Sequence, residues 1–79
     1  MKFKSSGHRV FEAADWHEAG RVVAGLKARQ AYGRELWEVR TCHVESFGDG
    51  FAEFVAFIGQ RDSNANVIGR NVRFTVRMA

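Results

Sequence analysis

Apolar side chains alternate with period two along Phe51–Ile58, and both resulting sets are hydrophobic. One set is Phe51, Val55 and Phe57, and the other is Ala52, Phe54, Ala56 and Ile58. A strand that is apolar on both faces must be shielded from water on both, whereas the rest of the pattern contains only one clear helix that could cover a face. We therefore predict that this segment is the centre of a sheet. The pattern leaves open which face the helix covers.

The helix is predicted to run from Trp16 to about Tyr32. Asp15 is of a residue type favoured at the N-cap, and Glu18 three residues later has the spacing of a capping box. Gly33 supplies the left-handed residue that commonly ends a helix. At about 100° per residue, one arc of the helix is apolar and is expected to face the sheet. This arc consists of Trp16, Ala19, Val22, Val23 and Leu26.

Four strands are expected beside this helix. They are His8–Ala13, Glu35–Ser46, Phe51 to Gly59 or Gln60, and Val67–Met78. The apolar phase of the second strand slips after Thr41, which predicts a β-bulge near Thr41–Cys42. In the last strand Val72, Phe74, Val76 and Met78 are expected to point inward. The order β-α-β-β-β predicts an α+β two-layer sandwich, in which one helix packs on an antiparallel sheet of about four strands.

Composition sets the size and environment of this fold. The 79 residues suffice for a single domain, 1–79, with residues 1–6 as a polar and partly mobile lead-in. The single cysteine excludes an intramolecular disulfide and fits a reducing compartment. No apolar run approaches the roughly 20 residues that cross a bilayer, and the amino terminus lacks the apolar core of a signal peptide. We expect a cytoplasmic protein without a membrane partner.

Catalytic and metal-binding patterns are missing from the sequence. Cys42 and His43 are neighbours in a predicted strand, so their side chains point to opposite faces and cannot share a metal ion. No glycine-rich loop follows a strand, and no serine has the setting of a nucleophile. We therefore expect no enzymatic activity, no metal and no cofactor.

A basic surface is the remaining candidate for function. The net charge is +3, and Arg73 and Arg77 project outward from the last strand, about 13 Å apart at the rise of a strand. Arg70 lies on its other side, and the amino-terminal cations join them if the first strand pairs close by. The candidate binding residues are Arg70, Arg73, Arg77, Lys2, Lys4, Arg9 and the aromatic Phe54.

Two binding hypotheses follow from these residues. An apolar sheet face without a helix, flanked by arginine, is typical of a protein interface. We therefore expect a protein or nucleoprotein partner, with a homodimer through this face as the simplest form. The alternative is direct nucleic-acid binding by the basic residues.

Gly50–Phe57 resembles the main ribonucleoprotein motif of RNA-recognition-motif domains. Asp49 replaces its basic residue, however, and Glu53 is inserted, so this family is rejected.

The arrangement of elements resembles a group of small inhibitors carried by phages and mobile elements, the type I anti-CRISPR proteins. The likeness is carried by the strand His8–Ala13, the helix between Asp15 and Gly33, and the three-strand meander Glu35–Met78. It implies binding to a nucleic-acid-targeting surveillance complex and interference with DNA recognition or nuclease recruitment. It implies no role for any individual residue.

Overall fold

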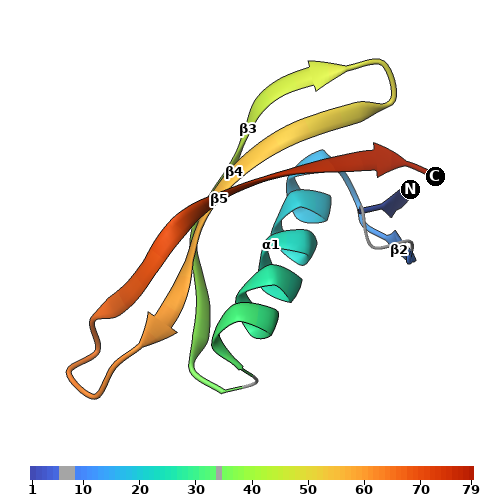
Figure 1. Cartoon of the computed structure of the whole chain (residues 1–79). Helices are drawn as coiled ribbons and strands as arrows, with labels where there is room; N and C mark the ends of the chain where they lie inside the picture. Colours follow the sequence, from blue (N-terminus) through green and yellow to red (C-terminus); the bar gives the residue numbers. More distant parts are fainter. Residues whose placement is uncertain (6–8, 34) are drawn as a thin grey trace.

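One helix and five strands make up the described residues, 1–5, 9–33 and 35–79, of the computed structural model (Figure 1). The elements are β1 (Lys2–Lys4), β2 (Val10–Glu12), α1 (Trp16–Tyr32), β3 (Trp37–Gly48), β4 (Phe51–Arg61) and β5 (Val67–Met78). The strands form an antiparallel sheet in the order β2-β1-β5-β4-β3. The predicted α+β sandwich is confirmed, with five strands in place of about four.

The additional strand comes from the amino terminus, where a partly mobile lead-in was expected. Phe3 in β1 is fully buried, opposite Phe11 of β2 and 4.8 Å from the Trp16 ring, measured between ring centroids. One apolar residue between two lysines is too short a pattern to predict a strand. Of the predicted first strand His8–Ala13, the first residue lies outside the described residues, and the observed β2 is shorter.

Both predicted ends of α1 are confirmed by hydrogen bonds. The Asp15 carboxylate accepts from the Glu18 backbone N–H at 2.8 Å, and the Glu18 carboxylate accepts from the Ala14 backbone N–H at 2.9 Å. The reciprocal bond therefore reaches one residue further back than in the usual capping box. At the other end Gly33 has φ 85°, and its N–H donates to the Arg29 carbonyl at 2.9 Å.

The predicted buried arc of α1 is wrong at Val22 and Leu26, whereas Ala19 and Val23 are buried and Trp16 packs partly buried against the core. Val22 and Leu26 are 36% and 44% exposed. The buried residues are mostly small: Ala19, Gly20, Val23, Ala24, Gly25 and Ala28. The physical reason is contact distance, because a Cβ at Gly20 would overlap the Phe54 ring. The sheet supplies the bulky side chains of the core, so the helix must supply small ones to pack closely.

Two register shifts between β3 and β4 determine which side chains of β3 point to each face of the sheet. Val39 pairs with Ile58 and Thr41 with Phe57, so Arg40 is an extra residue, one position before the predicted bulge. A second register shift, between Val44 and Ser46, was not predicted. Each shift reverses the alternation of side chains relative to β4.

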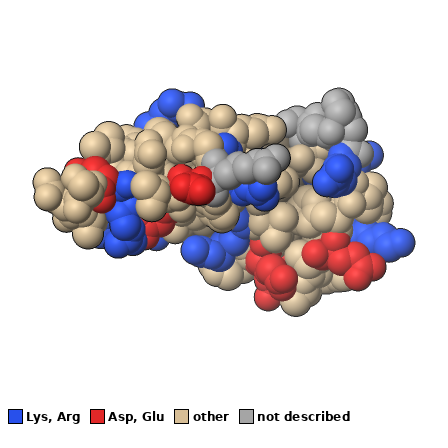
Figure 2. Space-filling view, turned by 90° about the horizontal axis from the view of Figure 1, so that it is seen from below, with Lys and Arg blue, Asp and Glu red and all other residues tan. Residues whose placement is uncertain are grey.

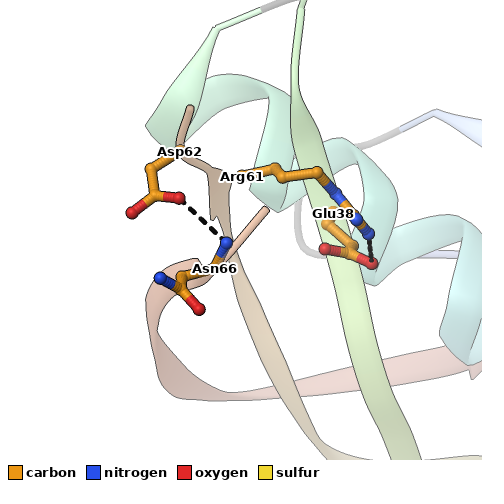
Figure 3. A network of polar contacts seen from close by, with 4 residues as sticks. All are labelled: Glu38, Arg61, Asp62 and Asn66. Carbon is orange, nitrogen blue, oxygen red and sulfur yellow. Dashed lines mark hydrogen bonds and ion pairs between the residues drawn. The ribbon is translucent and has the colours of Figure 1, made fainter. Parts of the chain in front are cut away.

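Polar contacts hold the loop between β4 and β5 and the end of β4. The Asp62 carboxylate accepts from the backbone N–H of Asn66 at 2.8 Å, and the Arg61 guanidinium contacts the Glu38 carboxylate of β3 at 2.7 Å (Figure 3). The loop therefore closes on itself, while Arg61 ties β4 to β3.

The question of which face of β4 the helix covers is settled by burial. Three side chains on the helix side, Phe54, Ala56 and Ile58, are at most 1% exposed. The other face carries Phe51 and Phe57, which are partly buried. Figure 1 shows α1 on one side of the sheet and no described element on the opposite side.

Candidate binding surface

The sheet face opposite α1 is the candidate functional surface, and we call it the open face. Register places its side chains in rows across three strands, because residues directly opposite each other project from the same face. His43, Val55 and Arg73 form one such row, at the centre of the sheet. The open face consists of Thr41, His43, Ser46, Phe51, Glu53, Val55, Phe57, Asn71, Arg73, Thr75 and Arg77, together with the bulge residue Glu45, whose side chain reaches Arg73.

Three apolar residues of β4, which we call the apolar row, lie in the middle of the open face, with the exposed Glu53 between Phe51 and Val55. Phe51, Val55 and Phe57 are partly buried although no described element packs over them. Long side chains from β5 provide part of their cover. The Arg77 guanidinium lies over the Phe51 ring, 5.4 Å from its centroid. Because such a contact is weak at an exposed site, a partner can displace the arginine and reach the ring.

A salt bridge crosses β4 beside this row. Arg73 Nε donates to Glu45 Oε1 at 2.8 Å, and a second guanidinium nitrogen donates to Oε2 at 3.3 Å. The hydrogen bond from Arg73 lowers the pKa of Glu45, and the nearby charges of Arg73 and His43 act in the same direction. Both side chains are exposed, 74% for Arg73 and 37% for Glu45. This exposed ion pair is therefore weak, and Arg73 or Glu45 can form an ion pair with a binding partner instead.

Three cations lie at one corner of the open face, which we call the basic corner: Lys2, Lys4 and Arg77. Lys4 lies directly opposite Arg77, and Lys2 lies opposite Glu12. The predicted first strand does not pair with the last strand; Lys4 lies beside Arg77 because the lysines themselves belong to β1, which pairs with β5. Arg9, which is exposed, immediately precedes β2. Like charges placed opposite each other destabilise a sheet, so an anion bound here would relieve repulsion between Lys4 and Arg77.

Two of the candidate binding residues lie on the other side of the sheet. Phe54 is fully buried beneath α1 and stacks on Phe74, with ring centroids 5.5 Å apart. It is a core residue that no partner can reach in this fold, and we remove it from the candidate set. Arg70 pairs with Ile58 and so projects toward the helix side, away from Arg73 and Arg77.

Glu45 is the member of the site that sequence reasoning missed as a partner of Arg73. The signal was present in the sequence, because Val44 and Phe47 are three residues apart and cannot share a face in a regular strand. A bulge between them, as the structure shows, allows both to lie on the helix side. The same bulge contains Glu45, whose carboxylate reaches Arg73.

Cys42 has none of the features of a catalytic nucleophile. It is 7% exposed on the helix side of β3, and burial raises the pKa of its thiol, with Arg21 acting weakly in the opposite direction. A buried, protonated thiol is unreactive. Among the described residues no three potential metal ligands lie close enough to hold an ion. Within that same part of the chain, no helix is long and apolar enough to span a bilayer.

Comparison with known proteins assigns no family to this chain. No protein-family model matches it, and no curated protein or solved structure is significantly similar to it. The function is therefore inferred from the geometry of the open face.

Proposed function

We propose that the chain is a non-enzymatic binding protein whose open face occupies a surface of a protein or nucleoprotein partner. The observation that carries this proposal is the apolar row Phe51, Val55 and Phe57, which lies on the sheet face that α1 leaves uncovered. Soluble domains rarely leave apolar residues uncovered in this way unless these residues form an interface.

The composition of the open face supports a protein interface. Aromatic and arginine side chains are enriched at binding hot spots. Phe51 and Phe57 lie on β4, beside the strand β5 that carries both Arg73 and Arg77. The polar residues around them include both charge signs, Arg73 with Glu45 and also Glu53. A partner carboxylate can replace Glu45 as the acceptor for Arg73, and the released Glu45 carboxylate is exposed enough to be hydrated.

The distribution of charge favours a protein interface over non-specific binding to the phosphates of a nucleic acid. On the side of the molecule that Figure 2 shows, acidic and basic side chains are interspersed, without a continuous field of one sign. Non-specific nucleic-acid binding depends on an extended positive surface. The resemblance to type I anti-CRISPR proteins suggests a more specific form, in which the partner is a nucleic-acid-targeting complex and binding inhibits it.

Direct nucleic-acid binding is the second candidate, and the basic corner is the observation in its favour. Lys2, Lys4 and Arg77 lie together there, with the Phe51 ring beneath Arg77. If these cations contact phosphates, the affinity for an oligonucleotide falls by roughly 0.7–0.9 log units per log unit of salt for each contact. Unchanged affinity in Lys4→Ala with Arg77→Ala would exclude this candidate.

Affinity capture with matched variants tests the leading proposal. Phe57→Glu places a charge in the apolar row, whereas Leu26→Glu places the same charge on the exposed outer side of α1, where Leu26 is 44% exposed. We expect the wild type and Leu26→Glu to retain the same partner from cells, and Phe57→Glu to lose it while remaining folded by circular dichroism. Equal retention by both variants would contradict the proposal. Retention only of a second copy of the chain would identify the homodimer.

A further inference from the structure

A groove lies mainly on the helix side of the sheet, beside β5, and shares Arg73 with the open face. α1 packs mainly against β3 and β4 and contacts β5 much less, so the helix side of β5 is incompletely covered. The resulting pocket has a volume of about 360 Å³. Its lining includes Lys27 and Gln30 of α1, Ile58 of β4, and Arg70, Val72 and Arg73 of β5.

The lining is positively charged and contains no carboxylate. Arg73 is held by Glu45, but among the described residues neither Lys27 nor Arg70 forms an ion pair. The Lys27 ammonium lies 5.8 Å from the centroid of the Phe74 ring. Ile58 and Val72 provide apolar surface between these cations. The groove is therefore complementary to a ligand that carries acidic groups on a partly apolar body.

The groove also reaches an unpaired strand edge. Arg70 and Val72 project toward the helix and Arg73 toward the open face, so a pocket lined by all three extends around the edge of β5. β1 pairs with β5 only at Arg77 and Met78. Between residues 67 and 76 no described strand pairs with that edge. Backbone N–H and C=O groups along such an edge are a template for another strand.

We propose that this groove binds an extended acidic segment of a partner protein, which adds to the edge of β5 as a further strand. Its backbone pairs with β5, and its acidic side chains contact Lys27 and Arg70. A peptide is favoured over a nucleic acid because only a polypeptide backbone offers alternating donors and acceptors to a strand edge. Arg73 is shared with the open face, but Lys27, Arg70 and the edge of β5 carry this inference, so it does not depend on the function proposed above.

A peptide titration followed by amide NMR tests this site. The probe is a short capped peptide in which Val and Glu alternate. We expect saturable shifts below about 1 mM at the amides of residues 70–74 and at Lys27 and Gln30. Lys27→Glu with Arg70→Glu weakens binding at least about tenfold. Arg29→Glu, an exposed change of the same kind on α1 outside the groove lining, serves as the matched control and preserves binding.

Three further probes decide between outcomes. The same peptide with N-methyl groups on alternate residues cannot pair as a strand, and we expect it to lose binding. A Val–Lys peptide that bound equally well would overturn the charge argument. An oligothymidylate that shifted the groove amides where the Val–Glu peptide did not would overturn the peptide assignment. If the double variant does not fold, Arg70→Glu alone provides the same comparison, since Arg70 is exposed.

Discussion

The Phe54 ring occupies the space in which a side chain at Gly20 would lie. This contact orients the molecule, because it brings the small-residue face of α1 onto one side of β4. Phe51, Val55 and Phe57 are consequently left on the other side. The close approach of Gly20 and Phe54 is thus one of the contacts that place α1 on this side of the central strand and leave the other side available for binding.

Gly20→Ala is expected to destabilise the protein. Overpacking of this kind typically costs about 1–3 kcal/mol, against a gain in helix propensity of up to about 1 kcal/mol. Gly25→Ala is the control on the same helix, since its Cβ would lie 3.4 Å from the Trp37 ring, an ordinary contact. We expect that variant to be neutral or stabilised. Urea unfolding compares the two, and equal stability would show that α1 does not contact Phe54 closely.

Truncation of two phenylalanines should separate the two faces of β4. Phe54→Ala removes a fully buried ring and is expected to cost about 3–5 kcal/mol. Phe57→Ala removes a ring that keeps some solvent access, so the loss in the free energy of unfolding should be smaller. Chemical denaturation measures both. A larger loss for Phe57 would mean that the open face is covered in the isolated protein.

The salt bridge on the open face should be visible in a carboxyl titration. Because Arg73 lowers the pKa of Glu45, the variant Arg73→Gln should raise it toward the ordinary value. The folded-state pKa is depressed, so the stabilisation from this pair is present above the unfolded-state pKa and is lost as the pH falls through the folded-state value. Carbon NMR of the Glu45 carboxyl measures this. An unchanged pKa in the variant would show that the pair does not form in solution.

Cys42 should react slowly and should make stability depend on alkaline pH. Burial raises the pKa of its thiol above the ordinary value of 9.0. Its contribution to stability is therefore complete below that value and declines as the pH rises through the higher folded-state pKa. Alkylation by iodoacetamide at neutral pH should require unfolding, and Cys42→Ala should reduce the alkaline decline. Rapid alkylation of the folded protein would place the thiol at the surface.

The parts of the fold that could be predicted from the sequence are those with a local cause. Caps at Asp15 and Gly33 gave the bounds of α1, and strict alternation gave Val67–Met78 as a strand, which is confirmed. The buried face of α1 could not be predicted from hydrophobicity. Val22 and Leu26 are more apolar than alanine or glycine, yet the distance to Phe54 decided the orientation.

The candidate site was predictable to the extent that alternation and pairing determine it. Arg73 and Arg77 project from one face, and Lys4 joins them because β1 pairs with β5. Phe54 could not be assigned, since both sets of β4 side chains are apolar and only the tertiary contact distinguishes them. The position of Glu45 depends on the bulge between Val44 and Ser46. The spacing of Val44 and Phe47 indicates this bulge, but it does not indicate that the Glu45 carboxylate reaches Arg73 across β4.

Site-specific photo-crosslinking in cells tests the central claim most directly. A benzophenone amino acid replaces Phe57 on the open face in one variant and Leu26 on the outer side of α1 in the other, both with partial solvent access. We expect a defined adduct with a partner macromolecule from position 57 and none from position 26. Adducts from position 26 alone, equal adducts from both positions, or none from position 57 would contradict this claim.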